Sequence, residues 1–418
     1  MLQKLKINNT LLVNISSLGL VQMANYLIPI VIVPYVVRAL RLEAYGTACY
    51  AQSIIFYLTL IVNYGFEYSA TQEIAINKEN KEKLGQIFWN VVHAKFILLL
   101  MTVAVLALLY FVMPQVHDDP SCFVIASLIN IGYVLFPSWF FQGMEKMAKM
   151  SVFTFSVKFI GAVFTVILVH QPQDYKLYLL SLSVAQIAAG LAAFLYVVWS
   201  YHLDYVSSWN CMRSDSVKKG FPIFVNTAFV NSNMFAGIAI MGFFLDDTHV
   251  GVYSGAQKII MAIMMITSQP IAVALFPRIS RRFSESRTAG LEYLKKSLVY
   301  ISAFSLLVSL LTFFAAPTMV GIMLGQEFGD SIPLLKYMAV LPFLVSLDTT
   351  MTVQGLYGMQ LQRFAPVVGG VTCAASILLN LMLIPKMQEL GIVVAWIICQ
   401  CIDILLATLL ILRYKNKE

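Results

Sequence analysis

Residues 22–75 have the sequence QMANYLIPIVIVPYVVRALRLEAYGTACYAQSIIFYLTLIVNYGFEYSATQEIA. It contains two apolar runs, each long enough to cross a lipid bilayer, joined by a short turn at residues 41–46. The first run holds Pro29 and Pro34, five residues apart. Within lipid a proline leaves the carbonyl four residues earlier unpaired, so we expect the helix to bend there. The stretch therefore predicts two membrane helices, the first with a hinge at its prolines.

Polar side chains lie inside these apolar runs, which is unusual for helices that only anchor a protein in lipid. They are Gln22 and Asn25 in the first run, Gln52 and Asn63 in the second, and Asn226 in a later run of the same kind. We interpret them as residues that line a polar path through the membrane. The alternative is that they form hydrogen bonds between helices.

The composition places the whole chain in a membrane. Of 418 residues, 59% are hydrophobic and 12% are charged, whereas soluble proteins are about one-quarter charged. The first apolar run follows a basic segment but continues to about residue 37 without a small-residue cleavage site, so we expect a retained span. The net charge of +7 lies in loops, and this distribution predicts no nucleic-acid partner.

The apolar segments predict an all-α polytopic membrane protein with about twelve transmembrane helices. They are residues 10–37, 47–75, 86–113, 121–143, 151–170, 176–202, 220–245, 250–277, 296–324, 332–360, 364–385 and 390–412. Twenty lysines and arginines fall in the loops on one side and five on the other. The positive-inside rule then predicts that both termini are cytoplasmic.

An internal repeat divides the predicted spans into two lobes. The pattern Gly46-x4-Ala51-Gln52 at the start of the second span recurs as Gly251-x4-Ala256-Gln257 at the start of the eighth. Residues 142–144, which end the fourth span, have a counterpart in residues 357–359, which end the tenth. We therefore predict two lobes of six helices in parallel orientation, residues 1–205 and 206–418.

Charged residues within the spans are the candidates for function, because a charge in hydrocarbon needs water or a partner. Lys258 is the strongest, since it follows the repeated glycine pattern; the alternative is an ion pair with a carboxylate such as Asp348. Arg38 ends the first span and could equally be an interfacial anchor. Asp348 and Asp403 lie near the middle of their spans and are candidates for ion coupling.

Three further charges have simpler interpretations. Glu67 is expected to be a solvated carboxylate at the cytoplasmic interface. For Lys95 and Lys158, a side chain that reaches toward water, or a structural ion pair, is at least as good an explanation as contact with a ligand.

Enzyme signatures are absent from the sequence. It has no GxxxxGK[ST] phosphate loop, no HExxH and no GxSxG, and its six cysteines are scattered. We therefore expect a protein that is not an enzyme and has no metal site and no cofactor.

Several motifs resemble the Wzx-type O-antigen flippases, a polysaccharide transporter branch of the MATE-like MOP exporter superfamily. They are Asn25-Tyr26-Leu27-x-Pro29, Pro34-Tyr35-x-x-Arg38-x-Leu40, Tyr45-Gly46, Tyr64-Gly65-Phe66, Ser69-Ala70-Thr71, Gln142-Gly143-x-Glu145-Lys146, Ala256-Gln257-Lys258-Ile259 and Phe276-Pro277-Arg278-Ile279-Ser280. The resemblance implies two six-helix bundles around a central cavity. It also implies a substrate, an oligosaccharide repeat unit on undecaprenyl diphosphate, moved from the inner to the outer leaflet of the bacterial inner membrane.

Under this resemblance Lys258 and Arg38 are the candidates for binding the diphosphate, since fixed cations pair with phosphate oxygens. The sequence leaves a proton, a sodium ion and the membrane potential as alternatives for the driving force. A polysaccharide polymerase and a chain-length regulator are the expected partners. The alternatives are an exporter of drugs or of another lipid-linked precursor, a membrane-embedded polymerase, and a scaffold for polysaccharide assembly. A drug cation exporter would need a cavity dominated by carboxylates. For such a cavity the first, second and eighth spans instead provide mainly Arg38 and Lys258.

Overall fold

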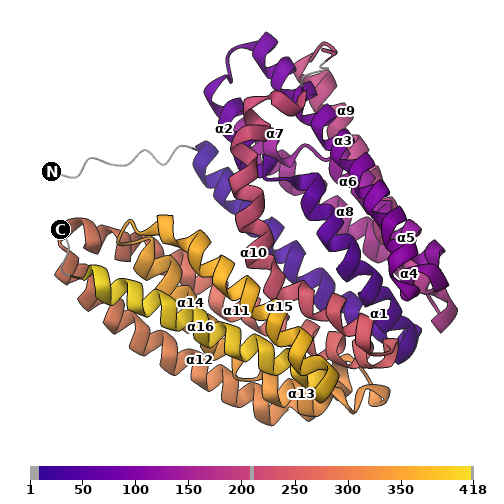
Figure 1. The fold of residues 1–418 in the computed structure, drawn as a ribbon. Helices are drawn as coiled ribbons and strands as arrows, with labels where there is room; N and C mark the ends of the chain where they lie inside the picture. Colours follow the sequence, from indigo (N-terminus) through magenta and orange to yellow (C-terminus); the bar gives the residue numbers. More distant parts are fainter. Residues whose placement is uncertain (1–8, 208–210, 416–418) are drawn as a thin grey trace. The chain divides into compact units, whose positions relative to one another are not determined.

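The computed structural model describes residues 9–207 and 211–415. Among these residues the side chains at positions 9–27, 29, 213, 230–235, 266 and 268–274 are not described. The regular secondary structure of the described residues is helical, without strands (Figure 1).

The helices follow one another along the chain with short connections. They are α1 (Asn9–Asn63), α2 (Phe66–Ile76), α3 (Lys81–Val112), α4 (Pro114–Asp118), α5 (Pro120–Ser127), α6 (Ile129–Leu135), α7 (Ser138–Gly143), α8 (Met147–Leu168), α9 (Tyr175–Tyr201), α10 (Asp215–Phe244), α11 (Asp247–Glu285), α12 (Arg287–Met323), α13 (Ser331–Met338), α14 (Leu341–Thr349), a π-helix (Thr350–Leu356), α15 (Ala365–Met387) and α16 (Glu389–Tyr414). Short 3-10 turns occur at Pro172–Asp174, Cys211–Arg213, Gln326–Phe328 and Gln362–Phe364.

Nine segments of the described residues are long and apolar enough to cross a membrane. One of them, Ile30–Ile76, contains the end of the first predicted span and the whole of the second. The helices α10 and α11, of 30 and 39 residues, contain some of the side chains that are not described, and they match the seventh and eighth predicted spans. The prediction of an all-α polytopic membrane protein is confirmed.

The joint between the first two spans is tighter than the predicted turn at residues 41–46. Helical structure is interrupted at Arg41 alone, where φ is 60°, and α1 resumes at once. A second break follows α1 at Tyr64 (φ 50°) and Gly65 (φ 104°). Glycine suits this position because its φ is left-handed and a Cβ there would lie 2.7 Å from the carbonyl oxygen of Gly220.

The fourth and tenth predicted spans are not single helices. The fourth is divided into α5, α6 and α7, and the tenth into α13, α14 and the π-helix. Prolines lie next to breaks in both, Pro137 before α7 and Pro342 in the first turn of α14. Hydropathy alone predicts a span but does not show such breaks, which here occur at corresponding places of the two predicted halves.

The chain forms two compact units, Met1–Ile32 with Ile54–Ala228, and Val33–Ser53 with Phe229–Glu418. The helices α1 and α10 therefore contribute residues to both. This grouping differs from the predicted lobes 1–205 and 206–418 in two segments, residues 33–53 and 206–228. The predicted lobes are defined by the repeat in the sequence and not by contacts, so the division into two lobes stays a prediction.

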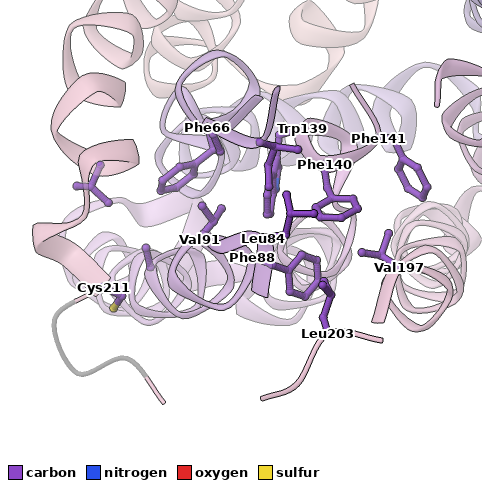
Figure 2. Close-up of a cluster of buried hydrophobic side chains, with 14 of the residues drawn as sticks. Phe66, Leu84, Phe88, Val91, Trp139, Phe140, Phe141, Val197, Leu203 and Cys211 are labelled. Atoms are coloured by element: carbon purple, nitrogen blue, oxygen red, sulfur yellow. The ribbon is translucent and has the colours of Figure 1, made fainter. Parts of the chain in front are cut away.

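An aromatic cluster forms the core of the first unit near α2, α3 and α7 (Figure 2). The ring of Phe88 lies 5.7 Å from the rings of both Trp139 and Phe140, measured between centroids, and all three are fully buried. Phe66, the first residue of α2, is buried in the same cluster. The cluster fixes where Glu67 and Ser138, its neighbours along the chain, are placed.

Large apolar side chains also cover the outside of both units. Phe111 in α3 is 81% exposed and Phe314 in α12 is 75% exposed. A surface with many exposed large apolar side chains is costly in water but is what contact with lipid requires.

Asp119, in the loop that precedes α5, forms polar contacts with the first two residues of α9. Asp119 accepts a hydrogen bond from the Tyr175 hydroxyl at 2.6 Å, and its other carboxylate oxygen lies 2.8 Å from the Lys176 ammonium. Partial burial raises the pKa of the Asp119 carboxyl, but the hydrogen bonds, that of Lys176 first, outweigh burial and hold this pKa below its ordinary value. A depressed carboxyl pKa stabilises the folded state above the ordinary value, and this stabilisation is lost as pH falls through the depressed value.

We therefore expect Asp119→Asn to lower the melting temperature at pH 7 by an amount that corresponds to at most about 1 kcal/mol. The difference from the wild type should shrink as the pH falls below about 4, the ordinary carboxyl range. Thermal unfolding of the purified protein across this pH range measures it. A difference that stays constant down to pH 2 would show that the Asp119 charge contributes nothing.

Candidate functional site

The second arm of α1 crosses the start of α11 at two glycines, Gly46 and Gly251. A Cβ built on Gly46 would lie 1.8 Å from the carbonyl oxygen of Asp247, and one on Gly251 would lie 2.3 Å from that of Leu42. Each glycine thus faces the carbonyl four residues before the other glycine. This reciprocal contact relates the two copies of the sequence repeat, and only glycine lets the backbones approach so closely.

Lys258 lies two helical turns beyond this crossing, on α11. Its side chain is half-buried, and it lies close enough to Cys49 on α1 for its charge to act on that thiol. Among the described residues Lys258 has no hydrogen bond and no ion pair, and none joins it to Asp348. The predicted diphosphate role of Lys258 stays a prediction, but its ammonium lies near Cys49 with its donors unused by the described residues.

Gln52 and Asn226 each have a buried polar atom without a hydrogen-bond partner among the described residues. These atoms are the Gln52 amide nitrogen and the Asn226 amide oxygen. Gln52 lies one turn after Cys49 and so shares its helix face. Unpaired buried amides are costly, so they are candidates for contact with a polar ligand or with water.

The structure shows less about the other residues predicted to line the path or to form the hinge. Asn63 is half-buried at the end of α1, and Pro34 is half-buried within it. The side chains of Gln22, Asn25 and Pro29 lie outside the described set, although their backbone is helical. Their roles as cavity lining and hinge therefore stay predictions.

Arg38 is exposed, and its guanidinium donates a hydrogen bond to the carbonyl of Ile322, in the last turn of α12. A helix C-terminus has a partial negative charge, so a cation stabilises it there. This contact agrees with the interpretation of Arg38 as an anchor. Its binding of a diphosphate stays a prediction.

The structure brings Asp348 and Asp403 together within the second unit. Asp348 accepts a hydrogen bond of 2.9 Å from the Thr352 hydroxyl, and Asp403 accepts one from the Thr372 hydroxyl. The two carboxylates are close enough for their charges to interact. Asp348 precedes the π-helix by two residues, and π-helical turns are frequent at functional positions.

Glu67 is half-buried near the start of α2, and its position at the cytoplasmic interface stays a prediction. Glu67 accepts hydrogen bonds from the Ser138 hydroxyl and, at 2.9 Å, from the Gln142 amide. Its charge also acts on Lys95, which is 2% exposed and donates a 2.8 Å hydrogen bond to the carbonyl of Tyr133. Lys95 is therefore a buried structural cation and does not reach toward water.

Because Lys95 is fully buried, removal of the nearby carboxylate should be costly. We expect Glu67→Gln, which preserves hydrogen-bonding groups, to destabilise the protein by about 3 kcal/mol, since it leaves a buried charge uncompensated. The double variant Glu67→Gln/Lys95→Met should recover most of this loss. Thermal unfolding in detergent measures both.

The matched control is Glu82→Gln, the same substitution at an exposed position of α3, which should change little. If the double variant is less stable than Glu67→Gln, the two charges do not compensate each other.

The long apolar helices define a multi-pass membrane protein. A sequence profile of the polysaccharide biosynthesis protein family matches residues 11–283, about two thirds of the chain. The chain belongs to this family.

Two relatives agree with this assignment. The chain is 29% identical over 412 residues to a protein of Escherichia coli (strain K12) named "Putative O-antigen transporter", with 97% of each chain covered. A protein of the same name from Shigella dysenteriae is 28% identical over 346 residues, which cover 81% of this chain and 84% of that protein.

The fold is similar to that of the lipid II flippase MurJ in an inward closed conformation. The TM-score is 0.70 at 14% identity, with 93% of this chain and 87% of that chain covered. An inward-facing multidrug resistance MATE transporter of the MOP superfamily gives a TM-score of 0.68 at 14% identity, with 97% and 99% covered. The predicted MATE-like MOP fold is confirmed.

Proposed function

We propose that this protein is a flippase for an oligosaccharide linked to undecaprenyl diphosphate, which it moves from the inner to the outer leaflet of a bacterial inner membrane. Membership of the polysaccharide biosynthesis family and the names of its relatives as O-antigen transporters support this substrate class. In this proposal both termini are cytoplasmic, as the excess of basic residues in the loops on their side favours.

The observation that carries the proposal is the position of Lys258. It is a half-buried cation two helical turns beyond the contact between the two sequence repeats, without an ion-pair partner among the described residues. Its ammonium would pair with the diphosphate, and the unpaired amide of Gln52 in the same unit would bind hydroxyl groups of the glycan. The polyprenyl chain can stay in lipid throughout.

Movement and its driving force form the second part of the proposal. Bending of α1 at Pro29 and Pro34 would let the path open to alternate sides. Asp348 and Asp403, whose charges interact, would bind the coupling proton or sodium ion. A polysaccharide polymerase and a chain-length regulator would receive the product at the outer leaflet.

Reconstitution tests the proposal directly. The full-length protein is placed in liposomes with the radiolabelled undecaprenyl-diphosphate-linked repeat unit from its own host. Exposure of the glycan on the opposite leaflet is then followed with a membrane-impermeant oxidant. We expect exposure to require the protein and an imposed proton or sodium gradient.

A multidrug exporter is the alternative outcome. The same liposomes, loaded with a cationic dye, should retain it under the same gradient. Export of the dye with no movement of the glycan lipid would overturn the flippase proposal.

A further inference from the structure

A polar pocket lies apart from the candidate path, at the end of the second unit that holds the last turn of α16. It lies between the end of α11, the start of α12 and the turn that follows the π-helix, and its volume is about 370 Å³. Small-molecule sites occupy about 300–1,000 Å³, so the pocket is large enough for a ligand.

One wall of the pocket is the ring of Phe283, which is held between two glycines. A Cβ on Gly290 of α12 would lie 2.2 Å from this ring, and one on Gly358 would lie 2.8 Å from it. Phe283 also packs against the buried apolar cluster of this unit. The wall is therefore fixed by close packing, which favours a preformed pocket.

The pocket is lined by Arg287, whose guanidinium nitrogen Nη1 is buried without a hydrogen-bond partner among the described residues. The neighbouring arginines differ in this respect. Arg282 pairs with Glu285 at 2.8 Å, and Arg281 lies 3.6 Å from the same carboxylate. Arg287 forms no ion pair with a described residue, so a cation with an unused donor faces the pocket.

Neutral groups that can bind an anion surround this cation. Ser280, Tyr357 and Gln360 line the same pocket and bring two hydroxyls and an amide. No carboxylate lines it. A guanidinium with hydroxyl and amide neighbours supplies the positive charge and the donors with which a phosphate group pairs.

We propose that this pocket is a binding site for a phosphate group, with Arg287 as the main contact. A phosphate displaces a few water molecules of about 30 Å³ each, so one such group fits within this volume. A phospholipid headgroup and a free phosphate compound have the same chemistry at this site. The proposal does not depend on the flippase function.

Two probes distinguish the sources. The full-length protein in detergent is titrated with sodium pyrophosphate by calorimetry. It is also placed in nanodiscs of phosphatidylcholine with or without phosphatidylglycerol, and retained lipid is counted by native mass spectrometry. We expect binding of at least one probe, and Arg287→Gln should weaken it at least about tenfold.

The matched control is Arg281→Gln, which removes the same charge from a residue that does not line the pocket and should leave binding unchanged. Tyr357→Phe, which removes only a hydroxyl, should weaken binding about threefold and serves if Arg287→Gln fails to fold.

Pyrophosphate binding that depends on Arg287 identifies a soluble phosphate ligand, and retention of phosphatidylglycerol alone identifies a lipid headgroup. Either result supports the site. Absence of binding of both probes, or equal loss in Arg281→Gln, overturns it.

Discussion

Lys258→Ala is expected to abolish transport of the lipid-linked oligosaccharide while the protein still accumulates in the membrane. The lysine is half-buried on α11 and has no ion-pair partner among the described residues, so its removal leaves no opposite charge unpaired there. Without the Lys258 ammonium, the diphosphate would lose its water with no positive charge to compensate, which costs several kcal/mol. A loss of transport of at least about 100-fold follows.

Lys258→Arg should keep part of the transport, because the charge remains but the reach and geometry of the donors change. Lys296→Ala is the control: this lysine is exposed and pairs with Glu292 at 3.0 Å, so transport should be unchanged. Transport and membrane abundance are measured together in the reconstituted and cellular systems. Full activity of Lys258→Ala, or its rescue by Lys258→Ala/Asp348→Ala, would remove Lys258 from the binding site.

The fold was predictable because long apolar runs are a property of local sequence. The predicted third span, residues 86–113, falls inside α3 (Lys81–Val112) to within one residue, and the last, 390–412, lies within α16 (Glu389–Tyr414). The break at Arg41 falls at the first residue of the predicted turn, but the breaks within the fourth and tenth spans were not predictable, because those segments stay apolar and their breaks depend on packing.

Contacts within the sites join residues that lie far apart along the chain, so the sequence does not predict them. Asp348 and Asp403 were predicted as intramembrane carboxylates, but their proximity across 55 residues needed the structure. The buried position of Lys95 likewise depends on residues of α2 and α6 that lie far from it in sequence. The signal available beforehand was its place in the middle of an apolar helix, which excludes free solvation but does not identify a partner.

Gly46→Ala is expected to destabilise the protein by about 4 kcal/mol or more. The added methyl carbon would lie 1.8 Å from the carbonyl oxygen of Asp247, where ordinary contact is about 3.4–4 Å. The obstacle is backbone, so no side chain can rotate away, and the helices α1 and α11 must separate. Separation also displaces Cys49 and Lys258, which lie beyond the crossing, so transport should fall with stability.

Three further variants make this prediction specific to the crossing. Gly251→Ala, which would meet the Leu42 carbonyl at 2.3 Å, should have a similar effect. The double variant should cost clearly less than the sum, because helices already separated by one methyl group have room for the other. Gly321→Ala in α12 is the control, since nothing lies within 4 Å of its added carbon. Thermal unfolding in detergent and transport assays compare the four proteins, and a Gly46→Ala protein as stable and active as Gly321→Ala would show that the two repeats do not meet there.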